Sequence, residues 1–221
     1  MKYISVFDII GPVMVGPSSS HTAGAARIGK ATRSLFGKEP KKITITLYGS
    51  FAKTYKGHGT DVALVGGLLD FDTNDLRIID SLVIAKDLDI DVRFVISDQE
   101  VRHPNTARIL LEDEKDSLEV VGVSVGGGKI NIVEINGFKI KVTGTTPSLL
   151  VFHVDKYGVI ASIANVLGLN EINIGYMEVA RKEKGSTALM VLETDQPVTK
   201  NVVLEIKALP SVKKIALLKI S

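Results

Sequence analysis

One short stretch of this chain concentrates side chains that can do chemistry. Residues 16–24 read Gly-Pro-Ser-Ser-Ser-His-Thr-Ala-Gly, so hydroxyls and an imidazole come directly before a run with helical spacing. Hydroxyls and the first backbone N–H groups of a helix donate hydrogen bonds to anions, and the helix dipole adds to that preference. His21 titrates near neutral pH, so it can also move a proton. The stretch predicts an anion-holding loop with a functional histidine.

A structural role is the alternative for the same loop. A serine or threonine there can serve only as the N-cap of a helix that begins near Ala23, although a cap needs no titratable neighbour such as His21. A second histidine, His58, lies between two glycines. Both histidines are expected in loops rather than on apolar faces, so solvent reaches them until a partner covers them. His153, within the apolar run 151–154, is instead expected to be a satisfied histidine in the core or at the edge of a strand.

The composition describes an ordinary globular chain. It has 221 residues, 45% hydrophobic and 24% charged, and its net charge is only +2. The basic residues are scattered, so nucleic acid is an unexpected partner. No apolar run approaches the ~20 residues that cross a bilayer, and no signal-peptide core is present, so a cytoplasmic protein is expected. The absence of cysteine excludes disulfides, thiolate nucleophiles and cysteine-ligated metal from this chain, and no metal ligands are expected in it.

An α+β fold is expected for residues 1–142, because helices come first and a run of strands follows. Residues 43–47 alternate strictly, as in a half-buried strand. Helices are expected at 51–56, 60–69 and 75–87. Further strands are expected at 89–97, 107–112, 118–125 and 129–135, with a hairpin-like connection at the three glycines 126–128. A doubly wound parallel sheet is not expected.

A second domain is expected at residues 148–221, after a polar seam at residues 143–147. Its pattern is strand 149–154, helix 158–167, strands 172–181 and 186–192, helix 199–208 and strand 212–220. This order is the ferredoxin-like βαββαβ plan. A unit of this size has a small core, so a paired copy or docking on the first domain is expected.

The second domain resembles the ACT domain, a module that commonly senses amino acids. The turn from first strand to first helix carries Asp155 and Gly158, and an Asn-rich entry into the next strand carries Asn170 and Asn173. Gly158 lets the chain turn closely and leaves N–H groups free for a carboxylate. The resemblance implies a small-ligand site lined by these four residues, for which serine is a candidate. Pairing of two copies through the strands is the other role expected of this module.

The whole chain resembles the β chains of iron–sulfur-dependent L-serine dehydratases. The resemblance is carried by residues 5–12 (Ser-Val-Phe-Asp-Ile-Ile-Gly-Pro), 16–22, 57–61 (Gly-His-Gly-Thr-Asp) and 126–128. It implies deamination of L-serine to pyruvate and ammonia, in a serine-catabolic or gluconeogenic setting. It also implies a separate α chain that holds a [4Fe-4S] cluster on its cysteines, with iron assisting loss of the β-hydroxyl. A chain without cysteine agrees with that division.

The resemblance also assigns roles to residues. It places His21 and His58 at the active-site interface with the α chain. One would accept the Cα proton and the other would donate to or orient the hydroxyl; which does which stays open, as does serine against threonine. The carboxylate of serine would be held by the neighbouring hydroxyls, namely Ser18, Ser19, Ser20 and Thr22.

Two rival functions remain. The chain could be a non-catalytic amino-acid sensor in which both the Ser-His loop and the ACT-like module bind ligands. It could also be a metal-free hydrolase with a Ser-His pair. The second is disfavoured, because adjacent Ser20 and His21 are not expected to reach the required geometry and no Gly-x-Ser-x-Gly elbow is present.

Overall fold

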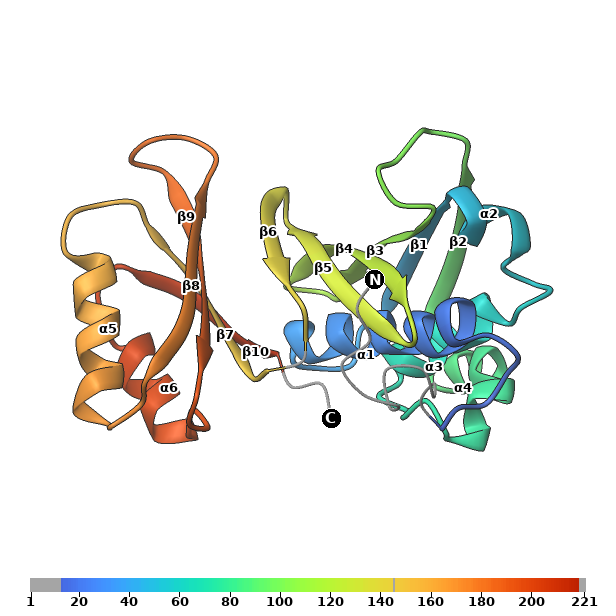
Figure 1. The fold of residues 1–221 in the computed structure, drawn as a ribbon, viewed down its shortest axis with the longest axis horizontal. Coiled ribbons are helices and arrows are strands. Elements are labelled where there is room, and N and C mark those ends of the chain that lie inside the picture. Colours follow the sequence, from blue (N-terminus) through green and yellow to red (C-terminus); the bar gives the residue numbers. More distant parts are fainter. Residues whose placement is uncertain (1–12, 145, 219–221) are drawn as a thin grey trace. The chain divides into compact units, whose positions relative to one another are not determined.

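The protein is an α+β chain, as expected, seen in a computed structural model that describes residues 13–144 and 146–218 (Figure 1). It contains one six-stranded and one four-stranded sheet. Contacts divide it into two compact units, Met1–Gly137 and Phe138–Ser221. The expected domain limits of 1–142 and 148–221 stay a prediction. Among the described residues, no helix is long and apolar enough to span a membrane.

The first unit begins with a helical run and ends in a sheet. A five-residue π-helical turn, Ser19–Ala23, continues into the first α-helix. The elements that follow are α1 (Gly24–Phe36), β1 (Lys42–Tyr48), α2 (Gly49–Thr54), α3 (Thr60–Leu68), a 3₁₀ turn (Leu76–Asp80), α4 (Ser81–Asp87), β2 (Asp91–Ser97), β3 (Asn105–Glu112), β4 (Ser117–Gly126) and β5 (Lys129–Ile135). The strands predicted in this region are confirmed. The helix predicted at 75–87 is confirmed with its first turn wound as 3₁₀.

The sheet order is β2-β1-β3-β4-β5-β6, where β6 is Phe138–Val142. Strand β1 is parallel to β2 and antiparallel to β3, and the β3–β4 and β4–β5 pairs are antiparallel. The expectation that the sheet is not doubly wound is therefore confirmed. Alternate residues of β1, namely Ile43, Ile45 and Leu47, are fully buried, which accounts for the alternation seen in the sequence.

Strand β6 is not among the sequence-based expectations. It follows Asn136 and Gly137, whose φ angles are both positive, at 48° and 77°. An Asn-Gly pair in this conformation is the preferred turn of a two-residue hairpin, and the residues after it alternate in burial. The local signal was therefore present in the sequence. By its contacts, β6 is counted with the second unit.

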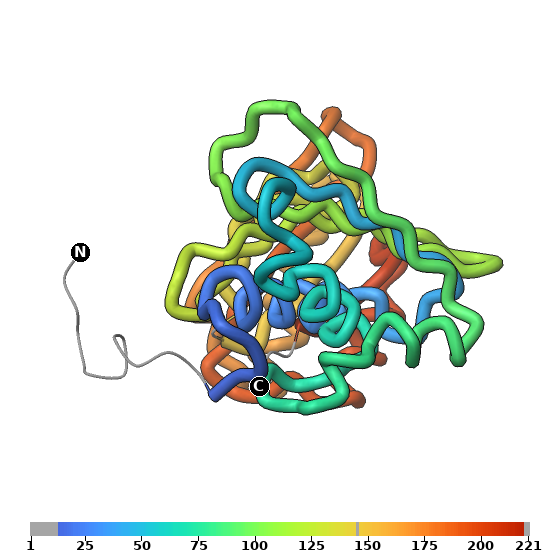
Figure 2. Tube along the Cα trace, turned by 90° about the vertical axis from the view of Figure 1, so that its right-hand side faces the viewer, coloured from blue at the N-terminus to red at the C-terminus, as the bar shows by residue number. Residues whose placement is uncertain are grey.

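Helices α1 and α3 cross at very close range. A Cβ atom added to Gly29 of α1 would overlap the backbone of Leu64, and one added to Gly67 of α3 would overlap the carbonyl oxygen of Ala26. Two glycines therefore allow the backbones to touch. On its other side α1 packs against β4 and β5, where Gly122 leaves room for Ile28. Figure 2 shows the turn that enters α1 beside the segment that joins α2 to α3.

The second unit has the predicted ferredoxin-like order. Its elements are β7 (Ser148–Val154), α5 (Val159–Leu169), β8 (Ile174–Arg181), β9 (Thr187–Thr194), α6 (Lys200–Lys207) and β10 (Val212–Leu218), with strand order β10-β7-β9-β8. Its core includes Leu149, Val151, Ile163, Met190 and Ile206. His153 lies in β7 and is 2% exposed, so the core, one of its two expected places, is confirmed.

Candidate active site

The residues predicted as a loop form a wide helical turn instead. The carbonyl oxygen of Ser18 accepts hydrogen bonds from the N–H groups of Thr22 (2.9 Å) and Ala23 (3.3 Å), and Ser19 accepts one from Gly24. The first N–H groups of the helical run therefore point back at the Ser-His segment, where they donate to the carbonyl oxygens of Ser18 and Ser19. Single π-helical turns of this kind occur often at functional sites. Here the turn brings Ser18, Ser20 and His21 together.

Both ring nitrogens of His21 contact hydroxyl groups. Nδ1 lies 3.1 Å from Oγ of Ser20 and 3.5 Å from Oγ of Ser18, whereas Nε2 lies 2.9 Å from Oγ of Ser50. Oγ of Ser18 also accepts the backbone N–H of His21 at 3.1 Å, so it is the N-cap of the turn. Adjacent Ser20 and His21 were not expected to reach a nucleophile–base geometry, and they lie within hydrogen-bond distance because the turn curls the Ser20 side chain back to the ring.

His58 lies in the turn between α2 and α3 and faces His21. Gly59, with φ of 64°, ends that turn and starts α3. The hydroxyl of Thr22 donates to the carbonyl oxygen of His58 at 3.0 Å, which joins the two turns. The imidazole rings lie edge to face with their centroids 5.0 Å apart, and Phe51 packs against His21 at 5.4 Å. Segments 36 residues apart thus place two imidazoles side by side.

Burial and a like charge both act on His21. Burial is the larger cause that lowers the pKa of His21 from its ordinary value of 6.5, and repulsion from His58 lowers it further. A lower pKa keeps more of the His21 imidazole neutral at pH 7. A neutral imidazole can accept a proton at one nitrogen while it donates from the other.

We expect NMR titration of histidine-labelled protein to give His21 a midpoint below 6.5. His58→Gln should raise that midpoint only partly, because burial is the larger cause and remains. His103→Gln is the matched control, since His103 lies in another loop and its ring accepts the N–H of Asn105. A midpoint at or above 6.5 in the unchanged protein would contradict the geometry.

The lowered pKa of His21 also makes the free energy of unfolding depend on pH. The folded chain binds a proton at His21 less readily than the unfolded chain does, so acid favours unfolding. The contribution of His21 is fully present above pH 6.5 and is lost as the pH falls through the lowered folded pKa. Denaturant midpoints measured on either side of pH 6.5 should therefore fall less with acid in His21→Gln.

Three buried polar atoms near these turns have no hydrogen-bond partner among the described residues. They are Nδ1 of His58, Oγ1 of Thr60 and Oγ of Ser124. Ser124 in β4 lies directly against Gly24, where an added Cβ would overlap its hydroxyl. A buried polar group without a partner is costly and calls for an explanation, which functional sites often provide. Both His58 and its surroundings therefore hold unused hydrogen-bonding capacity.

The predicted catalytic and carboxylate-binding residues are only partly brought together. Ser18, Ser20, His21 and His58 form one cluster. Thr22 is 3% exposed, and its hydroxyl donates to the carbonyl oxygen of His58. This hydroxyl therefore links the two turns rather than facing a ligand. Ser19 contributes its carbonyl oxygen to the turn. The roles of these residues stay predictions.

Ser50 belongs to this cluster and was missed by the sequence analysis. It follows Gly49, which has φ of 54° and whose position leaves no room for a Cβ beside Pro104. A glycine and then a serine at the carboxyl end of a strand, entering a helix, was the available signal.

The four residues predicted to hold an ACT ligand lie before and after α5. Asp155 accepts hydrogen bonds from Gly185 N–H (3.0 Å) and the Arg181 side chain (3.2 Å), and these hold the pKa of its carboxyl below the usual range. Gly158 precedes α5, whereas Asn170 and Asn173 follow it. An eleven-residue helix separates the two ends by ~16 Å. A joint ligand site for all four stays a prediction.

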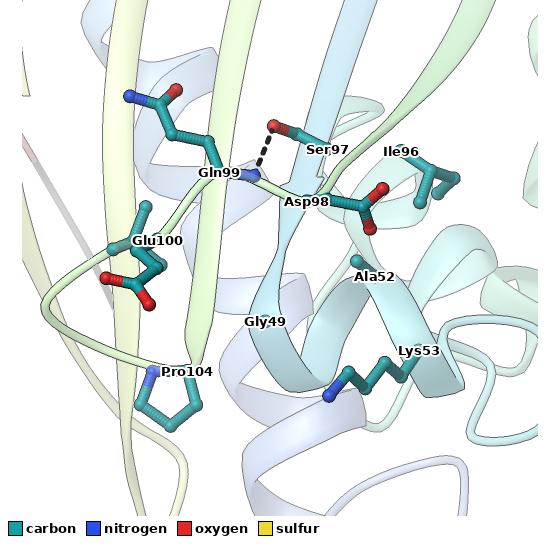
Figure 3. Close-up of a pocket in the computed structure, with 10 residues that line it drawn as sticks. Gly49, Ala52, Lys53, Ile96, Ser97, Asp98, Gln99, Glu100 and Pro104 are labelled. Carbon is teal, nitrogen blue, oxygen red and sulfur yellow. Dashed lines mark hydrogen bonds between the residues drawn. The ribbon is translucent and has the colours of Figure 1, made fainter.

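Two of the cavities lined by described residues lie outside the histidine cluster. One, of about 540 Å³, opens at the carboxyl ends of β1 and β2, and its lining includes Gly49, Lys53, Asp98 and Glu100 (Figure 3). Ser97 lies there too, with its hydroxyl accepting the N–H of Gln99 at 3.3 Å. The other, of about 230 Å³, lies at the start of α5 and includes Gly158. None of the other predicted site residues lines either cavity.

The fold and the site together define a two-unit α+β chain with paired imidazoles on its first unit and a ferredoxin-like second unit. The family model "Serine dehydratase beta chain" matches residues 5–87 and the model "ACT domain" matches residues 148–211. The N-terminal part of that first match, residues 5–12, lies outside the described residues. The chain belongs to the family of L-serine dehydratase beta chains.

Relatives match this chain over nearly its full length. It is 58% identical to the probable L-serine dehydratase beta chain of Bacillus subtilis, over 96% of each chain. It is 37% identical to the L-serine dehydratase beta chain of Peptoniphilus asaccharolyticus, over 91% of each. It is also 28% identical to D-3-phosphoglycerate dehydrogenase of Bacillus subtilis, over 88% of this chain and 37% of that protein. The resemblance seen in the sequence is therefore confirmed.

Proposed function

We propose that this chain is the β subunit of an L-serine dehydratase that converts L-serine to pyruvate and ammonia only together with an α subunit. The observation that carries the proposal is the pair of imidazoles 5.0 Å apart, one of which has a buried nitrogen without a partner among the described residues. Loss of water from serine needs a base at Cα and a donor at the β-hydroxyl. Two adjacent imidazoles can supply both.

The residues of this chain would then have separate roles in proton transfer, carboxylate binding and positioning. Neutral His21 or His58 takes the Cα proton, and the other ring donates to or orients the β-hydroxyl as it leaves as water. The aminoacrylate that remains adds water and releases ammonia, which gives pyruvate. Ser18, Ser19 and Ser20 would hold the carboxylate, and Thr22 would keep the two histidine turns in register through its bond to His58.

The [4Fe-4S] cluster implied by the family does not fit the residues of this chain. Such clusters are held by cysteine thiolates, and the sequence contains no cysteine. Among residues 13–144 and 146–218, no three His, Cys, Asp or Glu side chains gather in a way that could hold a metal ion. We therefore propose that the cluster belongs to a cysteine-containing α subunit, and we assign no step of it to this chain.

We expect activity only in the assembled pair. Anaerobic co-expression of this chain with the α chain from the same genome should give serine-dependent pyruvate. This chain alone should give none above background, because the proposed cluster is absent from it. Pyruvate is measured by coupling to lactate dehydrogenase, with threonine tested beside serine. A stable pair with an intact cluster that deaminates neither amino acid would overturn the proposal.

A non-catalytic sensing module is the second candidate. It is favoured by the similarity to D-3-phosphoglycerate dehydrogenase, a protein named for a different reaction that contains a region similar to both units. In this reading the ACT domain binds an amino acid such as serine, or pairs two copies of the chain through its strands. Serine binding to this chain alone, with no turnover in the pair, would favour sensing over catalysis.

A further inference from the structure

Ser50 is held in a fixed place beside His21 by the backbone around it. It lies in the first turn of α2, directly after β1, and its N–H donates to the carbonyl oxygen of Pro104 at 2.7 Å. Gly49 before it has φ of 54° and lies against Pro104, so only glycine fits there. The hydroxyl of Ser50 is 2.9 Å from Nε2 of His21. Among the described residues, that ring nitrogen is its side-chain partner.

The hydrogen bonds around His21 have a direction. The backbone N–H of His21 can only donate, and it donates to Oγ of Ser18. The hydroxyl proton of Ser18 is then free for Oγ of Ser20, 3.4 Å away, and the proton of Ser20 is free for Nδ1 of His21, 3.1 Å away. In this arrangement, which gives the hydroxyl protons of both Ser18 and Ser20 a partner within the turn, Nδ1 accepts. A neutral imidazole that accepts at Nδ1 carries its proton on Nε2.

The consequence falls on Ser50. Because Nε2 of His21 donates, Oγ of Ser50 accepts, and its own hydroxyl proton has no acceptor among the described residues. The opposite tautomer would turn the Ser20 proton towards Oγ of Ser18 and leave the Ser18 proton without a partner within the turn. Second partners that fix a tautomer in this way are common where a histidine takes part in proton transfer.

We propose that Ser50 is a positioning residue for His21: it fixes the neutral ring as the Nε2–H tautomer and offers its own proton to the hydroxyl or carboxylate of a small hydroxy amino acid. This inference rests on the proposed function for the identity of the substrate. It assigns a hydrogen-bond chain that runs from the backbone of the turn through His21 to Ser50. Up to the Ser50 hydroxyl, this hydrogen-bond chain consists of described residues alone.

The test uses three variants. Ser50→Ala removes the acceptor, Ser50→Thr retains a hydroxyl, and Ser97→Ala is the matched control. Ser97 is the last residue of β2 and carries a hydroxyl that accepts the N–H of Gln99. Nitrogen and carbon NMR shifts of labelled His21 report the tautomer in the full β chain, and kcat and KM for serine are measured in the complex with the α chain.

We expect wild type and Ser97→Ala to show His21 with its proton on Nε2. Ser50→Ala should shift His21 towards the Nδ1–H form and lower kcat about tenfold, as expected for one lost hydrogen bond, with KM changed less. Ser50→Thr should restore both. Unchanged His21 shifts in Ser50→Ala, or an equal kcat loss in Ser97→Ala, would overturn the proposal.

The two proposals can fail separately. A complex that deaminates no serine would overturn the proposed function and with it the substrate assigned to Ser50. The His21 spectra need only the β chain, so they would still decide whether Ser50 fixes the tautomer. Altered spectra with unchanged kcat in Ser50→Ala would show that the contact has no role in turnover, which also overturns the positioning role.

Discussion

We expect replacement of His21 or His58 with alanine to lower serine-dependent pyruvate formation by the proposed α–β complex about 10²- to 10⁴-fold. Proton transfer by a positioned side chain contributes an effect of this size. Each ring is held by contacts that bring it to the other, since Ser20 and Ser50 bind the His21 ring and Thr22 binds the His58 carbonyl. The expected loss is mainly in kcat, measured with saturating serine under anaerobic conditions.

The double replacement distinguishes a working pair from two separate effects. Residues that act as a unit give strongly non-additive losses, so the doubly replaced complex should be little worse than the poorer single variant. His103→Ala is the control, because that ring lies in the loop before β3 and accepts only a local N–H. Near-normal turnover in both single variants, with the complex intact, would rule out the assignment of His21 and His58.

The sequence predicts the fold well wherever a local pattern coincides with a buried face. The alternation at 43–47 predicts β1 because Ile43, Ile45 and Leu47 all point into the core. The order of strands and helices after residue 147 predicts the ferredoxin-like unit, since each helix crosses one short sheet. The pair Asn136-Gly137 and the alternation after it indicate a hairpin, so strand β6 is predictable from the sequence although it is not among the expectations.

The site is predicted in its members but not in its geometry. The motif around His21 and the glycine-flanked His58 predict two functional histidines, and the fold brings them within contact. The π-helical turn was not predicted, although its hydrogen bonds are local, and its link to His58 through Thr22 joins segments 36 residues apart, which no local pattern indicates. Ser50 was missed for the same reason: its partner His21 is 29 residues distant, and only the fold joins them.

The position of both histidine turns depends on the contact between α1 and α3. Thr22 and Ala23 lead into α1, and His58 lies just before α3, so the spacing of these helices sets the spacing of the rings. Glycine at position 67 allows α3 to touch the carbonyl oxygen of Ala26 and the N–H of Lys30. The helices cannot separate without moving the imidazoles apart.

Gly67→Ala is therefore expected to destabilise the first unit by about 3 kcal/mol, because the added methyl meets backbone that cannot move aside as a side chain would. For a unit of this size the melting temperature should fall by roughly 10 °C, measured by circular dichroism. The complex should also lose turnover below its new melting temperature, because α1 and α3 are pushed apart.

Gly168→Ala in α5 is the matched control, since a Cβ there meets nothing within 4 Å. Replacing a helical glycine by alanine in open space stabilises by about 0.5–1 kcal/mol, so this variant should melt at the same temperature or slightly higher. The opposite signs expected for the two glycines separate steric overlap from helix propensity. Equal melting temperatures for Gly67→Ala and the unchanged chain would mean that α1 and α3 lie further apart than described, and that the two imidazoles are not held together by this crossing.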